Sequence, residues 1–335
     1  MKISVLGAGT WGVALASLLV RNGHEVILWS ALESEIEELK ATGAHKNLPG
    51  STIPEGLKYE TDEERAVTGA ELVLFVVASE YIRTTAERVA PYLCDGVITV
   101  TAAKGIERGT LYTMSEIITD VLDKARPELK YTVAALSGPT HAEEVALGMP
   151  TSVVSACSDE EISRRIAAAF FNSCMRVYTN TDIIGVEIAG ALKNIIALAA
   201  GMARGMGFGD NALAMLITRG VAEITRMGLA MGCKRRTFMG LAGIGDLIVT
   251  CTSRHSRNNR CGAMIGGGMT YAEASAEIGM VVEGYHALEA AQALAERHGV
   301  EMPITSAVAD VILNGVTTKE AMLALMSRDI KSELE

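Results

Sequence analysis

Cysteine is scarce in this sequence of 335 residues, and the six that occur form no C-x-x-C pair and show no regular spacing. This usage argues against a disulfide framework and against a zinc site, so we expect no metal. A reducing cytoplasm fits such a pattern best. The six residues are Cys94, Cys157, Cys174, Cys233, Cys251 and Cys261.

Basic runs and long uncharged apolar runs are also missing. The formal net charge is −10 at pH 7, which repels nucleic acid and anionic lipid, so we expect neither as a partner. The chain reaches a glycine turn at Gly7, too early for a signal peptide. The most apolar stretch, residues 185–206, is interrupted by charges and lacks the roughly 18 uncharged residues of a membrane span. These charges are Glu187, Lys193 and Arg204, and we expect a buried helix here instead.

Short apolar runs alternate with helical patterns in the first half of the chain, which is typical of βαβ units around a parallel sheet. The expected strands are residues 2–6, 25–29, 71–77, 97–101 and 131–136, with further strands at 153–156 and 176–178. The expected helices of this half are residues 11–22, 33–41, 81–90 and 111–124.

After about Thr181 the composition shifts to alanine, leucine and methionine in long helical patterns. The sequence therefore predicts an α/β chain in which residues 1–181 form a Rossmann-type doubly wound, dinucleotide-binding sheet. Residues 182–335 would form an all-helical, substrate-binding domain. No linker rich in Pro, Ser or Gly separates the two, so we expect them to pack closely around a ligand cleft.

A glycine fingerprint follows the first predicted strand, in the order Gly7-Ala8-Gly9-Thr10-Trp11-Gly12. In a G-x-G-x-x-G at the start of a helix, the glycines allow a tight turn, a close approach of pyrophosphate and close packing of helix on strand. The free N–H groups at the helix N-terminus add a partial positive charge. A glycine turn without function is the alternative, but the surrounding βαβ pattern favours nucleotide binding.

The choice between NAD and NADP depends on the end of the second strand, which reads Leu28-Trp29-Ser30-Ala31. Neither an acidic residue for the ribose hydroxyls nor a basic one for a 2′-phosphate occurs there. No lysine or arginine lies between Asn22 and Leu39, whereas Glu33, Glu35, Glu37 and Glu38 do, which disfavours a 2′-phosphate. We therefore expect NAD or NADP, with a preference for NAD.

Two lysines stand out as candidates for proton transfer. Lys193 is surrounded by apolar residues in a predicted helix, and Gly190 one turn earlier leaves space for a ligand beside its amine. Burying an ammonium group favours its neutral form, which suits proton exchange near neutral pH. Lys104 follows the strand 97–101, at the carboxyl edge where doubly wound sheets bind ligands. The alternatives are a snorkelling lysine at a helix edge and a solvated loop lysine.

Together, these residues resemble the bacterial NAD(P)-dependent glycerol-3-phosphate dehydrogenases over nearly the whole chain. Seven motifs in this order carry the resemblance. They are the fingerprint at residues 7–12, Ala102-Ala103-Lys104-Gly105, Ser137-Gly138-Pro139-Thr140-His141-Ala142, Gly190-Ala191-Leu192-Lys193-Asn194, Gly243-Ile244-Gly245-Asp246-Leu247, Ser256-Arg257-Asn258 and Val281-Val282-Glu283-Gly284.

The resemblance implies hydride transfer between NAD(P)H and dihydroxyacetone phosphate, giving sn-glycerol 3-phosphate for phospholipid synthesis. It implies that Lys193 and Lys104 are catalytic, Lys193 by proton transfer to the C2 oxygen of the substrate. The implied substrate contacts are Lys104, Gly138, Thr140, Lys193, Asp246, Ser256, Arg257 and Asn258. The implied cofactor contacts are Gly7, Gly9, Thr10, Trp11, Gly12, Lys104, Ala142, Arg257, Val281 and Glu283. The family often has a basic residue where this chain has Ala31, which weighs against tight NADPH binding.

Chemistry alone leaves other roles open for several of these residues. Ser256-Arg257-Asn258 offers a hydroxyl, a guanidinium and an amide suited to a phosphate, but an exposed basic loop is the commoner explanation of such a triplet. Asp246 has a rival role as a helix N-cap, and Glu283 as a solvated acid at a helix end.

Two rival functions are also open. β-Hydroxyacid dehydrogenases and ketopantoate reductases look similar, but tend to place an asparagine one helical turn after the lysine, where this chain has Ala197. A non-catalytic NAD(P)-sensing module would not need a buried lysine. A small-molecule substrate is the expected partner, and the sequence leaves a homodimer open.

Overall fold

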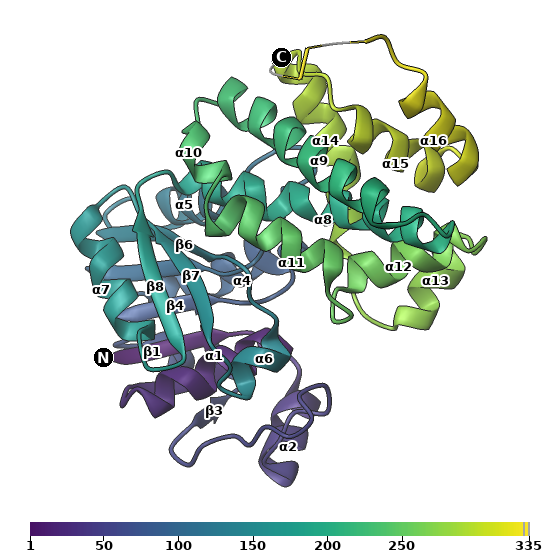
Figure 1. The fold of residues 1–335 in the computed structure, drawn as a ribbon. Coiled ribbons are helices and arrows are strands. Elements are labelled where there is room, and N and C mark those ends of the chain that lie inside the picture. The colour runs from purple at the N-terminus through teal and green to yellow at the C-terminus, as the bar shows by residue number, and fades with distance from the viewer. Residues whose placement is uncertain (331, 334–335) are drawn as a thin grey trace. The chain divides into compact units, whose positions relative to one another are not determined.

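A computed structural model describes residues 1–330 and 332–333 of the chain (Figure 1). The chain folds into two compact units. The first unit comprises Met1–Gly190 and Arg236–Asp246, and the second comprises Ala191–Arg235 and the part of Leu247–Glu335 that is described. The units interleave along the sequence because residues 236–246 return to the first unit, and the first boundary falls within α8 (Ile183–Gly205). These units are defined by their internal contacts. The division into a dinucleotide-binding domain at residues 1–181 and a substrate-binding domain at residues 182–335 stays a prediction.

The first unit is built on one eight-stranded sheet in the order β3-β2-β1-β4-β5-β6-β7-β8. Neighbouring strands are parallel except β6 and β7, which are antiparallel. The first six strands follow the order 3-2-1-4-5-6 of dinucleotide-binding folds, so the predicted fold class is confirmed. The strands are β1 (Lys2–Leu6), β2 (Glu25–Trp29), β3 (Lys58–Glu60), β4 (Leu72–Phe75), β5 (Val97–Thr101), β6 (Tyr131–Ser137), β7 (Thr151–Ala156) and β8 (Met175–Asn180).

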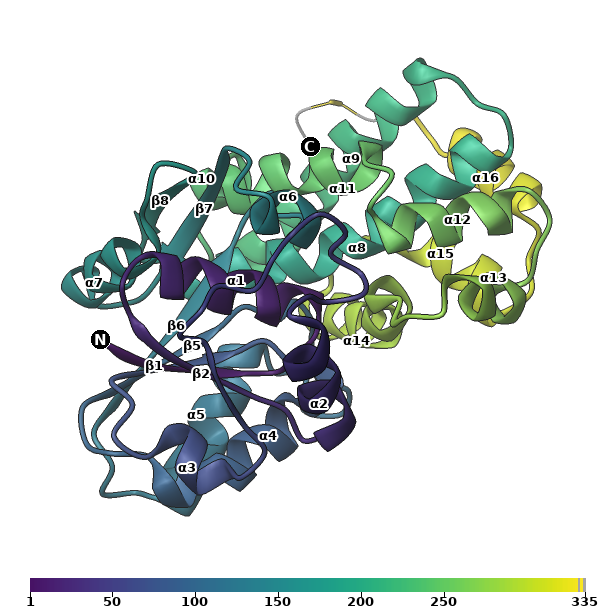
Figure 2. The ribbon, with the colours of Figure 1, turned by 90° about the horizontal axis from the view of Figure 1, so that it is seen from below.

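Helices cover both faces of this sheet, as Figure 2 shows for α1 on one face and α3, α4 and α5 on the other. The apolar strands supply two cores because successive side chains point to opposite faces. In β4, Leu72 and Leu74 pack under α1, while Val73 and Phe75 pack against α4 and α5. The helices of this unit are α1 (Thr10–Arg21), α2 (Glu33–Thr42), α3 (Glu63–Val67), α4 (Ile82–Val89), α5 (Met114–Ala125), α6 (Ala142–Ala146) and α7 (Glu160–Phe170).

The described part of the second unit is helical, with α8 closely packed against α12. A methyl group on Gly201 would lie 2.1 Å from the backbone oxygen of Asn259, and one on Gly262 would lie 2.2 Å from that of Leu198. Glycine is therefore required for the two backbones to approach this closely. The remaining helices of this unit are α9 (Asp210–Ala230), α11 (Asp246–Thr252), α12 (Arg257–Gly266), α13 (Tyr271–Ile278), α14 (Glu283–His298), α15 (Pro303–Leu313) and α16 (Thr318–Met326). Helix α10 (Arg235–Phe238) belongs to the first unit from Arg236 onward.

Helix α8 is long and apolar enough to cross a membrane by length and composition. Its most apolar window of 18 residues is 83% buried inside the protein, however, and residues 185–203 all lie in the interior. This burial is the pattern of a core helix, as the sequence predicted for this stretch.

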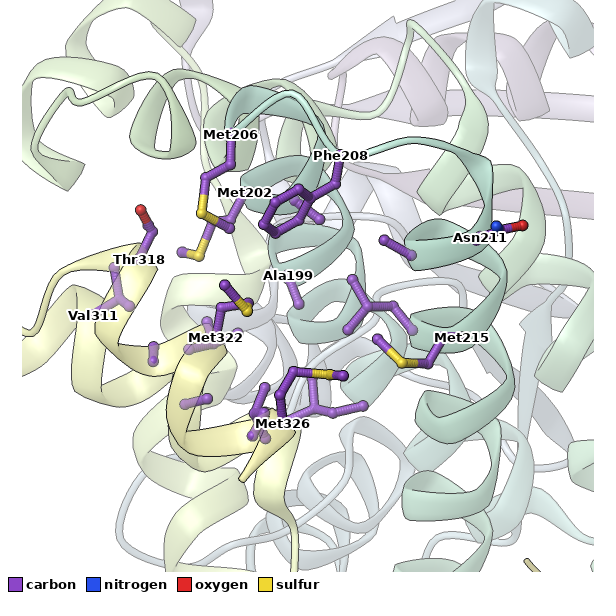
Figure 3. Close-up of a pocket in the computed structure, with 18 residues that line it drawn as sticks. Ala199, Met202, Met206, Phe208, Asn211, Met215, Val311, Thr318, Met322 and Met326 are labelled. Carbon is purple, nitrogen blue, oxygen red and sulfur yellow. The ribbon is translucent and has the colours of Figure 1, made fainter. Parts of the chain in front are cut away.

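An apolar cavity of about 390 Å³ lies among α8, α9, α15 and α16 in the second unit. Figure 3 shows Met202, Met206, Met215, Met322 and Met326 around it. Its lining is apolar apart from Asn211 and Thr318, and none of the predicted site residues belongs to it. A site for a charged substrate needs convergent polar groups, so we do not assign the active site to this cavity.

Candidate active site

The glycine loop lies at the carboxyl end of β1, whose neighbours are β2 and β4. Gly7 has φ of +119°, and a methyl group there would lie 2.9 Å from the backbone nitrogen of Val77. A methyl group on Gly12 would lie 1.8 Å from the backbone oxygen of Gly7, whereas Gly9 faces open space. Helix α1 then begins at Thr10 without an acidic residue in its first turn. The open space at Gly9 and the uncapped N-terminus fit a dinucleotide pyrophosphate.

The end of β2 presents an acid that the sequence analysis did not place. Ser30 Oγ donates a hydrogen bond to Glu35 Oε2 at 2.6 Å and accepts one from the backbone nitrogen of Leu32 at 3.1 Å. The guanidinium of Arg88 lies over the Trp29 ring at 5.2 Å, and it also pairs with Glu63. The carboxylate at this edge suits ribose hydroxyls better than a 2′-phosphate.

Lys104 is the centre of a small hydrogen-bonded cluster in the first unit. It lies just after β5, with 18% of its side chain exposed. Its Nζ donates to Asp246 Oδ2 at 2.6 Å and to the backbone oxygen of Gly138 at 3.2 Å. The Asp246 side chain is only 2% exposed. The structure thus brings together three of the predicted site residues, Lys104, Gly138 and Asp246. Asp246 is the first residue of α11, and its carboxylate pairs with Lys104.

The turn after β6 adds further predicted residues to this centre. Thr140 Oγ1 donates to the backbone oxygen of Gly138 at 3.2 Å, and Ala142 is the first residue of α6. Ser137 was not predicted. Its Oγ is buried and has no hydrogen-bond partner among the described residues, and a methyl group on Gly190 would lie 3.2 Å from it. A buried hydroxyl of this kind marks a place where a ligand group could bind.

Lys193 is the polar centre of the second unit, and it is buried as predicted, with 6% of the residue exposed. Its Nζ donates to Thr250 Oγ1 at 2.6 Å. Thr250 was not predicted, although it lies four residues after Asp246 and therefore on the same face of α11. The hydroxyl holds the amine of Lys193 in a defined direction.

The triplet at residues 256–258 is part of the framework of the second unit. Asn258 Nδ2 donates to Asn194 Oδ1 at 3.0 Å, and Asn258 Oδ1 accepts from the backbone nitrogen of Gly284 at 2.9 Å. Asn258 therefore ties α12 to α8 and α14. Ser256 Oγ caps α12 by accepting from the backbone nitrogen of Asn259 at 3.2 Å. The exposed basic loop considered for this triplet does not describe it, because Ser256 and Asn258 are buried.

Arg257 and Val281, two of the predicted cofactor contacts, are hydrogen-bonded to each other. Arg257 Nη1 donates to the backbone oxygen of Val281 at 3.1 Å, just before Glu283 begins α14. The other guanidinium donors of Arg257 are well suited to a phosphate group.

Known families account for almost all of this chain. The model of the NAD-dependent glycerol-3-phosphate dehydrogenase N-terminus matches residues 2–163, and that of the C-terminus matches residues 182–323. The chain belongs to the NAD-dependent glycerol-3-phosphate dehydrogenase family. The resemblance on which the sequence analysis relied is thereby confirmed.

Other members of the glycerol-3-phosphate dehydrogenase family match along their full length. A glycerol-3-phosphate dehydrogenase [NAD(P)+] of Lactobacillus delbrueckii subsp. bulgaricus is 51% identical over 333 residues, which cover 99% of both chains. The crystal structure of the Coxiella burnetii glycerol-3-phosphate dehydrogenase is 36% identical, with a TM-score of 0.92, and covers 98% of this chain and 99% of that one. A ketopantoate reductase of Ralstonia eutropha, at 20% identity and a TM-score of 0.61, shares the fold alone.

Proposed function

We propose that this protein is an NAD(P)-dependent sn-glycerol-3-phosphate dehydrogenase that interconverts dihydroxyacetone phosphate and sn-glycerol 3-phosphate. The observation that carries the proposal is the buried amine of Lys193, held by Thr250 in a chain of this family. The role would be to supply glycerol 3-phosphate to phospholipid synthesis in the cytoplasm. We also propose that it acts on a small-molecule substrate without nucleic acid.

The glycine loop and α1 would hold the cofactor, with Gly7, Gly9, Thr10, Trp11 and Gly12 around its pyrophosphate. The open space at Gly9 supports this role. NAD(P) supplies, when bound, the nicotinamide ring that exchanges a hydride with C2 of the substrate. Further cofactor contacts are proposed for Lys104, Ala142, Arg257, Val281 and Glu283. The Ser30–Glu35 pair at the end of β2 favours NAD over NADP.

Lys193 would give a proton from Nζ to the C2 oxygen of dihydroxyacetone phosphate, and would take it back in the reverse direction. The hydrogen bond from Nζ to Thr250 Oγ1 fixes the position of the Lys193 amine. Lys104 would stabilise the negative charge that develops on the same oxygen, while Asp246 holds the Lys104 Nζ in place. Asn194 would add hydrogen-bond support.

The phosphate of the substrate would bind the donors of Arg257, Asn258 and Ser256. Arg257 keeps guanidinium donors beyond the one that meets Val281. Asn258 has one N–H of its amide committed to Asn194, so we assign the other to the substrate. Gly138, Thr140 and Asp246 are the remaining proposed substrate contacts.

The test is oxidation of NADH by the purified protein with three separate substrates: dihydroxyacetone phosphate, ketopantoate and the semialdehyde that corresponds to 3-hydroxyisobutyrate. We expect NADH absorbance to fall only with dihydroxyacetone phosphate. Turnover of either other substrate at a higher kcat/KM would replace the proposed function with one of the related reductases. Binding of NADH without oxidation of it under any of the three would indicate a nucleotide sensor.

A further inference from the structure

A buried carboxylate that the proposed reaction does not use lies on α8. Glu187 is 5% exposed, and its Oε1 accepts a hydrogen bond from the backbone nitrogen of Ser115 at 2.8 Å. Its Oε2 accepts from Ser115 Oγ at 2.5 Å. Burial raises the pKa of this carboxyl to about 7. Replacing a buried charged group by an apolar one often stabilises a protein, so stability alone is a weak reason for this residue.

The partner of Glu187 is the N-terminus of α5. Thr113 is the N-cap of this helix and Glu116 completes its capping box, so Ser115 occupies the second helical position. Backbone N–H groups in the first turn lack partners within the helix, and a carboxylate suits both these donors and the helix dipole. Glu187 thus attaches the start of α5 to α8.

The start of α5 is also the end of the segment that carries Lys104. Residues 102–113 connect β5 to α5, and a bridge between Ile106 and Thr113 closes this segment on itself. We call residues 102–113 the lysine loop. Its first residues are fixed by β5, and the contact of Glu187 with Ser115 fixes the helix that follows its other end.

The lysine loop meets α8 at a second point, one turn further along. A methyl group on Gly190 would lie 3.5 Å from Cγ of Lys104 and 3.7 Å from its Cδ. Glu187 and Gly190 are three residues apart and lie on the same side of the helix. One stretch of α8 therefore packs against the loop at Lys104 and is hydrogen-bonded to the first turn of the helix that follows the loop.

We propose that Glu187 is a positioning residue: its contact with the start of α5 fixes the lysine loop against α8 and thereby sets the position of the Lys104 ammonium group during turnover. This inference rests on the proposed function, in which Lys104 stabilises the developing charge. Glu187 itself touches neither substrate nor cofactor in this account.

The chain contains a matched control in Glu223 of α9. Its carboxylate accepts from the backbone nitrogens of Ile304 and Thr305 at 2.9 Å each, and from Thr305 Oγ1 at 2.7 Å. It is 1% exposed, and burial raises its pKa as well. Glu223 therefore caps the start of α15 as Glu187 caps that of α5, but α15 is not preceded by a loop with a proposed catalytic residue.

The experiment compares wild type, Glu187→Ala, Glu187→Gln and Glu223→Ala by kcat and KM for dihydroxyacetone phosphate and NADH, together with Tm. Because a misplacement of about 1 Å can reduce turnover by roughly 10²-fold, we expect Glu187→Ala to lower kcat by about 10–100-fold. Glu187→Gln should restore most of kcat, since its amide oxygen still accepts from Ser115. Glu223→Ala should lower Tm and leave kcat as in wild type.

Two results would overturn the inference while leaving the proposed function intact: wild-type kcat in Glu187→Ala, or equal losses of kcat in Glu187→Ala and Glu223→Ala. If Glu187→Ala does not fold, Ser115→Ala removes one of the two hydrogen bonds, and unchanged kcat in Ser115→Ala would overturn the inference equally. A wild-type protein that does not oxidise NADH with dihydroxyacetone phosphate refutes the proposed function itself, and the inference falls with it.

Discussion

The Glu187→Gln substitution makes the stability of the protein depend less on pH. Burial raises the pKa of Glu187 most strongly and nearby Glu116 adds to this, while hydrogen bonds from Ser115 and Thr113 lower it, with a result of about 7. The ordinary value is 4.5. Between these two pH values the folded protein keeps a proton that the unfolded chain releases. The wild type therefore loses stability as pH rises through this window, and the full loss applies above pH 7.

The size of this loss follows from the two pKa values. At about 1.4 kcal/mol per pH unit, the difference between 4.5 and about 7 corresponds to roughly 3 kcal/mol in the free energy of unfolding. Glutamine keeps the shape of the protonated acid but does not titrate. The advantage of Glu187→Gln over wild type should therefore grow by roughly 3 kcal/mol between about pH 4.5 and about pH 8.

Urea unfolding of both proteins at a series of pH values, followed by circular dichroism, measures this difference. The other titrating groups are common to the two proteins, so they cancel when the free energies are subtracted at each pH. A difference that stays constant across the series would refute the reasoning, because it would mean that Glu187 titrates alike in the folded and unfolded chains. A difference that shrinks with rising pH would mean that the folded protein favours the ionised carboxylate.

Three further predictions concern the proposed reaction. Lys193→Ala should lower kcat by roughly 10²–10⁴-fold and leave NADH affinity unchanged in a binding titration; near-normal turnover would remove the proton role from Lys193. Arg257→Ala should raise KM for dihydroxyacetone phosphate by about 10–100-fold, the effect of losing one hydrogen bond to a charged group, and an unchanged KM would contradict its phosphate contact. Glu35→Lys should raise kcat/KM with NADPH relative to NADH several-fold, because it replaces a carboxylate near the end of β2 by a cation; an unchanged ratio would place cofactor selection elsewhere.

Most of the sheet could be predicted because its strands are almost continuous apolar runs. The expected strands at residues 2–6, 25–29 and 97–101 agree with β1, β2 and β5. Strand β3 was missed. It has only three residues, Lys58, Tyr59 and Glu60, none of them buried, and it lies at the edge of the sheet. Its position depends on pairing with β2 rather than on apolar side chains.

The candidate site could be predicted only in part. Burial of Lys193 followed from its apolar neighbours, whereas the partner of Lys104 is Asp246, 142 residues away, and no local pattern reveals such a pairing. Thr250 was overlooked because a threonine in an apolar helix is ordinary. Glu187 entered the sequence analysis merely as a charge that interrupts a long apolar stretch. Its contact with Ser115 depends on tertiary structure.

The tight seam between α8 and α12 limits how this protein can vary. Gly262 stands five residues after Arg257 on a helix whose first turn offers the proposed phosphate donors. Any side chain at Gly262, even a methyl, would force α12 outward and carry those donors with it. Variants designed for larger substrates should therefore keep the glycines between α8 and α12 and carry their substitutions in the flanking loops, where a larger side chain does not displace a whole helix.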